Sequence, residues 1–140
     1  MSTSGMNKEG AKCLRKTAIV YLLIAAICIA VTNIYALFGH GVRSGAMDFM
    51  FLYPLLGGTL VYFLLFLLFP TVCLRPFYRI TANLYNCGIA TLTSGAMLKG
   101  IFDIAGTASR YVLFFEVLGW ALIASGICVF LVATARDTYD

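Results

Sequence analysis

Residues 49–69 read FMFLYPLLGGTLVYFLLFLLF and contain no charged side chain. A helix needs about 20 apolar residues, at 1.5 Å each, to cross the roughly 30 Å hydrocarbon core of a bilayer. This stretch is long enough to do so, and Pro70 ends it because proline lacks the backbone N–H that a further helical turn requires. The stretch therefore predicts a transmembrane helix.

The composition of the whole chain indicates the same environment. Of the 140 residues, 61% are hydrophobic and 11% are charged, and the mean hydropathy is +0.93. A soluble domain carries roughly a quarter of charged residues, and one of this size has too little interior to bury so much apolar surface. The composition excludes a secreted disulfide scaffold, a disordered tail, a nucleic-acid binder and a soluble enzyme.

Three other stretches are expected to cross the membrane with residues 49–69. Residues 18–38 and 111–135 are strongly apolar, whereas residues 81–103 carry several polar side chains, among them Lys99 and Asp103. We predict an all-α integral membrane protein, a bundle of four transmembrane helices that form two antiparallel hairpins. It divides into a mobile cytoplasmic segment, residues 1–16, and a four-helix membrane domain, residues 17–140.

The basic residues predict the orientation, because loops rich in Lys and Arg stay on the cytoplasmic side. The expected inner side holds Lys8, Lys12, Arg15, Lys16, Arg75, Arg79 and Arg136, and the outer loops hold only Arg43 and Arg110. Both termini are therefore expected in the cytoplasm, with short outer loops at 39–48 and 104–110. We expect a bacterial cytoplasmic membrane.

The inner connection, residues 70–80, predicts that membrane lipids are partners of this chain. Arg75 and Arg79 are expected to contact lipid headgroups, and Phe77 and Tyr78 suit the interface, where aromatic side chains are enriched. A homo-oligomer or another membrane subunit is the second kind of partner. No basic run interleaved with aromatic residues points to nucleic acid.

The five cysteines are expected to be thiols. Cys13 and Cys73 fall on the predicted cytoplasmic side, and the other three lie within spans. The reducing cytosol does not favour disulfides, and the C-x-x-C spacing of redox and zinc sites is absent.

Small residues define one face of the third predicted helix. Gly88, Thr91 and Gly95 recur at three- and four-residue steps, which places them on one side of a helix, with Leu92 on another. Small residues let helices approach closely in lipid, and Gly119 and Gly126 offer a matching groove in the fourth helix. We predict helix packing along this face; the alternative is a polar path lined by its hydroxyls together with Asn83 and Asn86.

Four charged residues gather near the expected outer side: Lys99, Asp103, Arg110 and Glu116. Lys99 and Asp103 are four apart and can pair on one helix face, and Glu116 could meet Lys99 or Arg110 across the short loop. The favoured interpretation is an interfacial ion-pair cluster that fixes the third and fourth helices. The alternative is a small solute or proton site open to the outside, since charges at a membrane edge are often functional.

Other polar residues give weaker signals. Asn33 and Asn86 are each expected to hydrogen-bond across helices, and His40 is expected to be solvated in the first outer loop. No second histidine, cysteine cluster or acidic pair provides a metal site, and the sequence patterns of known enzyme classes are absent. We expect no catalytic residue, no cofactor and no metal.

Two functional classes follow. The first is a structural or accessory membrane protein that packs through the Gly/Thr face of the third helix. The second is a small homo-oligomeric transporter or channel that uses the polar third helix and the cluster of Lys99, Asp103 and Glu116. The first is favoured, because the other predicted helices offer few polar groups to complete a path.

Overall fold

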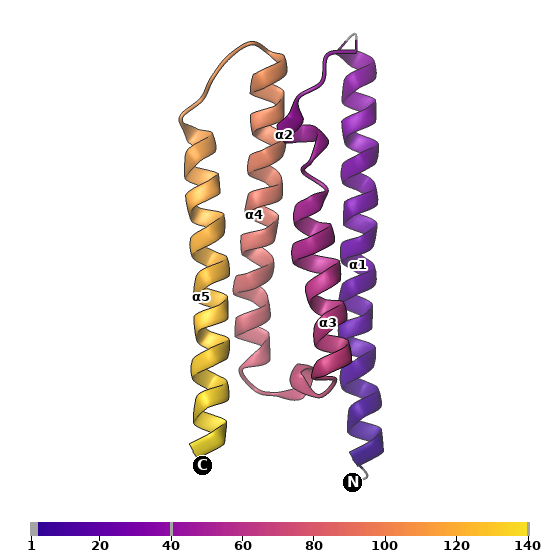
Figure 1. Ribbon diagram of the computed structural model, residues 1–140, viewed down its shortest axis with the longest axis vertical. Coiled ribbons are helices and arrows are strands. Elements are labelled where there is room, and N and C mark those ends of the chain that lie inside the picture. Colours follow the sequence, from indigo (N-terminus) through magenta and orange to yellow (C-terminus); the bar gives the residue numbers. More distant parts are fainter. Residues whose placement is uncertain (1–2, 40, 140) are drawn as a thin grey trace.

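The computed structural model describes residues 3–39 and 41–139, and every regular element in these ranges is a helix (Figure 1). This confirms the all-helical prediction for the described residues. The elements are α1 (Thr3–Phe38), α2 (Gly45–Asp48), the π-helix η1 (Tyr53–Leu60), α3 (Val61–Leu68), the short 3-10 helix η2 (Val72–Leu74), α4 (Tyr78–Ile104) and α5 (Tyr111–Tyr139).

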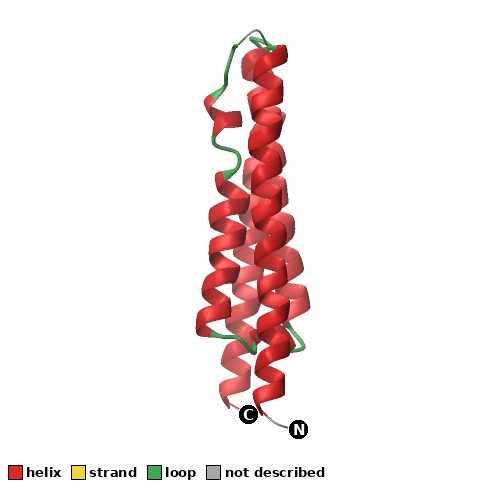
Figure 2. Ribbon diagram, turned by 90° about the vertical axis from the view of Figure 1, so that its right-hand side faces the viewer, coloured by secondary structure: helices red, strands yellow, loops and turns green. Residues whose placement is uncertain are grey.

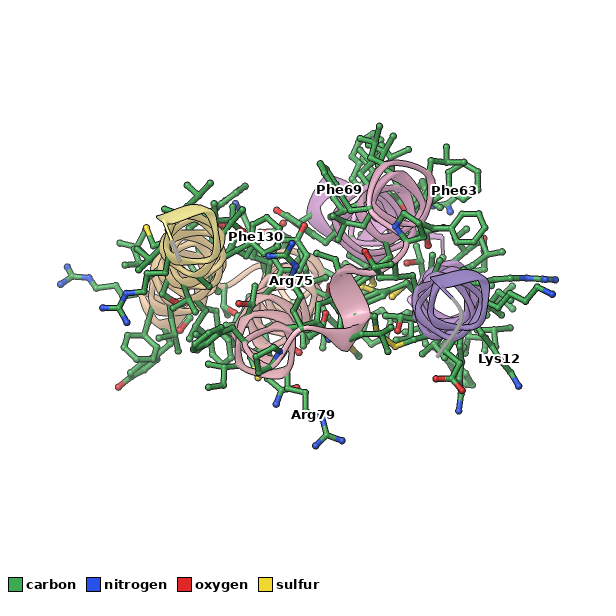
Figure 3. All side chains as sticks on the ribbon, turned by 90° about the horizontal axis from the view of Figure 1, so that it is seen from below. Lys12, Phe63, Phe69, Arg75, Arg79 and Phe130 are labelled. Carbon is green, nitrogen blue, oxygen red and sulfur yellow. A yellow bond between two sulfur atoms is a disulfide. The ribbon has the colours of Figure 1, made fainter. Side chains whose placement is uncertain are left out.

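The long helices stand in an open row. Figure 1 shows them in the order α5, α4, η1–α3 and α1, and the molecule is narrower when it is turned by 90° (Figure 2). Seen from below, α1 and α5 lie at the two ends of the row, and α3 is offset to one side (Figure 3). The main contacts follow this order: α5 packs on α4, α4 on η1, and α1 on both η1 and α3. We call the end with both chain termini the terminal end, and the opposite end the loop end.

Helix α1 begins earlier than the sequence suggested. Residues 3–16 belong to the same helix as the apolar stretch that follows, so the boundary expected after residue 16 falls inside a continuous helix. Small and apolar residues in this part of α1 pack against the rest of the protein. Leu14 is fully buried, and Gly10 lies so close to the carbonyl of Pro70 that a Cβ atom there would collide with it.

The second apolar stretch is broken rather than continuous. The short helix α2 is followed by turns at residues 49–51, and the helix resumes before η1, which has Pro54 in its first turn. Proline suits a helix start because its missing N–H has no partner there. The predicted single helix over residues 49–69 is therefore wrong in its first turn, although α3 does end at Leu68, just before Pro70.

The expected outer loop at residues 39–48 is also wrong in its second half. Ser44 caps α2 by accepting a hydrogen bond from the backbone N–H of Ala46, and Met47 is only 1% exposed. Met47 packs against Gly100 of α4, and a side chain at position 100 would collide with it. Helix α2 therefore turns back into the row instead of facing solvent.

Helices α4 and α5 meet along a glycine seam formed by Gly88, Gly95, Gly119 and Gly126. A Cβ atom on Gly88 would lie 2.9 Å from the carbonyl oxygen of Gly119 and 2.6 Å from Ile123, closer than packed atoms approach. Leu92 covers Gly119 in the same seam, so its expected place on another face is wrong. Thr91 instead donates a hydrogen bond to the carbonyl of Cys87 in its own helix, at 2.7 Å.

Within residues 3–39 and 41–139, three helical segments are long and apolar enough to cross a membrane: Lys8–Phe38, Gly45–Leu68 and Tyr111–Arg136. Helix α4 has 27 residues, which extend about 40 Å at 1.5 Å per residue. It is thus nearly as long as α5, which has 29 residues, but more polar.

The seam predicts the effect of adding volume to α4. Gly88→Leu should lower the thermal unfolding midpoint in detergent by several degrees, because overpacking costs about 1–3 kcal/mol and the atoms in the way include backbone. Ala90→Leu adds volume at an exposed position of the same helix and should leave the midpoint unchanged. Equal midpoints for the two variants would contradict the packing described for the seam.

Candidate functional site

A polar cluster at the middle of the row joins three helices. The side-chain oxygen Oδ1 of Asn86 in α4 accepts hydrogen bonds from the hydroxyls of Tyr21 in α1, at 2.8 Å, and Tyr62 in α3, at 2.6 Å. The two tyrosine rings stack with their centroids 5.7 Å apart, and Tyr62 is only 2% exposed. Asn86 therefore holds α1, α3 and α4 together through one oxygen atom. Its predicted role, a hydrogen bond between helices, is what the structure shows.

The π-helix η1 completes this cluster. Tyr85 of α4 donates a hydrogen bond to the backbone carbonyl of Gly57, at 2.8 Å, and Gly58 leaves room for the ring of Tyr21. These tyrosines were missed in the sequence, where they stand as isolated aromatic residues in apolar stretches. Their only signal was that a buried tyrosine needs a partner for its hydroxyl.

The charged residues at the loop end form two separate contacts. The Nζ atom of Lys99 lies 3.5 Å from Oε1 of Glu116, which links α4 to α5. Asp103 accepts a hydrogen bond from Ser44, at 2.7 Å, so its expected pairing with Lys99 is wrong. The reason is α2, which brings Ser44 to Asp103 and was not foreseen. Arg110 is exposed in the segment before α5.

A hollow of about 300 Å³ lies beside the Lys99–Glu116 pair. Its wall comes from residues after Ser44 and from α4 and α5, among them Ala46, Tyr53 and Leu92. The two charged side chains are 49% and 42% exposed, and exposed pairs of this kind are weak and open easily. This arrangement could hold a small charged or zwitterionic solute.

An aliphatic layer separates the two polar clusters. Asn86 and Lys99 are about 20 Å apart along α4, and Ile89, Leu92 and Ile123 are buried between them. Thr91 and Thr93 lie in the same part of α4, but they donate to the carbonyls of Cys87 and Ile89 in their own helix. The polar side chains of α4 are therefore used in local contacts rather than in a continuous route.

The remaining polar residues near the loop end make surface contacts. Asn33 donates to the carbonyl of Ile29 in its own helix, at 2.8 Å, so its expected bond to another helix is wrong. Arg43 forms an ion pair with Asp48, at 3.2 Å, and His40 lies outside the described residues. Within the described ranges no group of three His, Cys, Asp or Glu side chains could hold a metal ion.

Two cysteines at the terminal end form a disulfide. Cys13 of α1 is bonded to Cys73 of η2, and their Cα atoms are 6.6 Å apart. The expectation that all five cysteines are thiols is therefore wrong for this pair. The short helix η2 folds back against α1, and Val72 beside Cys73 joins the buried core around Leu14. The spacing of the cysteines in the sequence does not predict that η2 folds back in this way.

Comparisons with protein-family models, with curated proteins and with solved structures found no match to this chain.

The hydrogen bonds of Asn86 predict a loss of stability when its amide is removed. Asn86→Leu keeps the size of the side chain but leaves the hydroxyls of Tyr21 and Tyr62 without their acceptor. Buried groups left in this way cost about 1–3 kcal/mol, so the unfolding midpoint in detergent should fall. Asn83→Leu, at an exposed position one turn earlier, is the control and should have little effect; equal effects would refute the role given to Asn86.

Proposed function

We propose that this chain is a small polytopic membrane protein of the structural or accessory type. It crosses a bacterial cytoplasmic membrane four times, with both termini in the cytoplasm. Its three most apolar segments span the bilayer in lipid contact, and α4 spans it within the row.

Internal pairing supports a membrane position for α4. Polar groups are costly in hydrocarbon unless they are hydrogen-bonded, and Asn86, Thr91 and Thr93 all have partners within the row. Lys99 lies about two turns from the loop end and has Glu116 beside it. The polar residues that make α4 less apolar than its neighbours therefore do not prevent it from spanning.

The distribution of basic residues supports the proposed orientation. Lys12, Arg15, Arg75 and Arg79 lie near the terminal end, and positive charge is retained on the cytoplasmic side. Cys13 and Cys73 lie at the same end. A disulfide is unusual in the reducing cytosol, so the basic residues alone support this orientation.

The aliphatic layer formed by Ile89, Leu92 and Ile123 is the observation that favours an accessory role over transport. A transport route needs polar groups that continue from one side of the membrane to the other, whereas these three buried side chains separate the two polar clusters. The open row also leaves broad apolar faces uncovered, which another membrane protein could contact.

Trp120 marks the face of α5 on which such a contact is proposed. It is the only tryptophan of the chain, it is 60% exposed, and it lies about one turn from the middle of the Tyr111–Arg136 segment. Tryptophan prefers the membrane interface to the centre and is enriched at binding hot spots. We propose that Trp120 contacts a helix of the partner subunit.

The mass and stoichiometry of the complex in native-lipid nanodiscs test this function. We expect a second membrane protein in a fixed ratio to this chain. Trp120→Ala should reduce its recovery severalfold, because it removes a large contact on α5. Phe63→Ala removes an aromatic side chain on α3 that is 50% exposed and should leave the recovery unchanged. A homo-oligomer with no second subunit would contradict the accessory role.

The second candidate is a small homo-oligomeric transporter or channel, which the hollow beside Lys99 and Glu116 favours. Purified protein in liposomes distinguishes the two functions. Solute flux that Glu116→Gln abolishes would support the transporter, whereas flux no greater than that of empty liposomes would support the accessory protein.

A further inference from the structure

The disulfide between Cys13 and Cys73 ties α1 to η2 at the terminal end, across 60 residues of chain. Under the proposed orientation this end lies in the cytoplasm, where reducing thiols keep most cysteines unpaired. A disulfide that does form there is usually transient and serves in catalysis or in sensing the redox state. The location of the bond is therefore typical of a disulfide that opens and closes.

Contacts other than the bond also hold η2 against α1. Val72 precedes Cys73 in the chain and is only 6% exposed. It packs in the same buried core as Leu14, which follows Cys13. Gly10 lies one turn before Leu14, and a Cβ atom there would collide with the backbone just before η2. These contacts do not need the bond, so they keep the two sulfur atoms near each other when it is open, and reactants held together react faster than free ones.

The two cysteines differ in their access to a reagent. Cys13 lies at an exposed position of α1, whereas Cys73 is partly buried against the core. An external thiol or disulfide therefore meets Cys13 first, and Cys73 lies beside it as the second reactant. An accessible cysteine next to a resolving cysteine is the usual arrangement of a redox-sensing pair.

We propose that Cys13 and Cys73 form a reversible redox site, which is closed by a small cytosolic disulfide such as oxidised glutathione and opened by the corresponding thiol. Closure ties the connection between α3 and α4 to α1, and the structure shows this oxidised state. The inference rests on the proposed orientation, which places the pair in the cytoplasm.

Closure proceeds in two exchange steps. The thiolate of Cys13 attacks one sulfur atom of the small disulfide, whose S–S bond breaks and releases one small thiolate. The thiolate of Cys73 then attacks the sulfur of Cys13 in this mixed disulfide, and the second small thiolate leaves. The two protons lost by the cysteines pass through solvent to the released thiolates. Two cysteines are thus oxidised to one disulfide, and one small disulfide is reduced to two thiols.

The state of the pair in cells tests the proposal. Cys28, Cys87 and Cys128, which are free in the structure, are replaced by alanine so that every remaining thiol belongs to the pair. Free thiols are counted by the mass that a maleimide adds after acid quenching. We expect two in resting cells, none after brief treatment with diamide, which oxidises cellular glutathione, and two again after its removal. Two throughout, none throughout, or glutathione still attached after diamide would overturn the proposal.

A pair without free thiols in resting cells has two causes, which a membrane-impermeant phosphine reductant separates. Opening of the bond in intact cells would show that the terminal end faces outward, which refutes the proposed orientation. Opening only after permeabilisation would leave the orientation in place and refute only the reversible redox site.

The rate of closure tests Val72 as a positioning residue. Reduced, purified protein is mixed with oxidised glutathione in detergent, and the loss of free thiols is followed in time. Val72→Ala weakens the packing of η2 on α1 and should slow closure severalfold. Leu74→Ala, at a 43% exposed position of the same short helix, should leave the rate unchanged. Equal rates for the two variants would contradict the positioning on which repeated closure depends.

Discussion

The fold depends on one acceptor, the side-chain oxygen of Asn86. Two tyrosine hydroxyls from two other helices converge on it, at 2.8 and 2.6 Å. In an apolar environment an unpaired amide or hydroxyl is costly, so each tyrosine hydroxyl needs the oxygen of Asn86 as its acceptor. This requirement brings α1 and α3 to α4. It also makes the most polar long helix a member of the row, because the side-chain oxygen of Asn86 meets its two donors only there.

The glycine seam supplies the complementary constraint on α5. Hydrogen bonds position α1 and α3, whereas α5 is held by close contact of backbone and side chains around Gly88 and Gly119. Small residues are the usual means by which helices associate in lipid, where the hydrophobic effect does not draw them together. The row is therefore joined by polar contacts on one side of α4 and by small-residue packing on the other.

How much could be predicted from the sequence depends on how local each signal is. The apolar stretches predict the helices because hydropathy and length are properties of a continuous segment, and the glycines of α4 and α5 predict close packing for the same reason. The break before Tyr53, the helix α2 and the pairing of Cys13 with Cys73 depend on contacts between distant segments. The contact of Asp103 with Ser44 was missed because the loop was expected to face solvent, and the partners of Asn86 were missed because the tyrosines looked like ordinary apolar positions.

The most direct test of the account is whether α4 crosses the membrane. Single cysteines are introduced at Pro76→Cys, Ala90→Cys or Thr107→Cys in a chain whose five natural cysteines have been replaced, and intact cells are treated with a membrane-impermeant maleimide. We predict labelling of Thr107→Cys in intact cells, labelling of Pro76→Cys only after permeabilisation, and no labelling of Ala90→Cys in either state. Labelling of Pro76→Cys and Thr107→Cys from the same side would show that α4 does not span the membrane and would contradict the account.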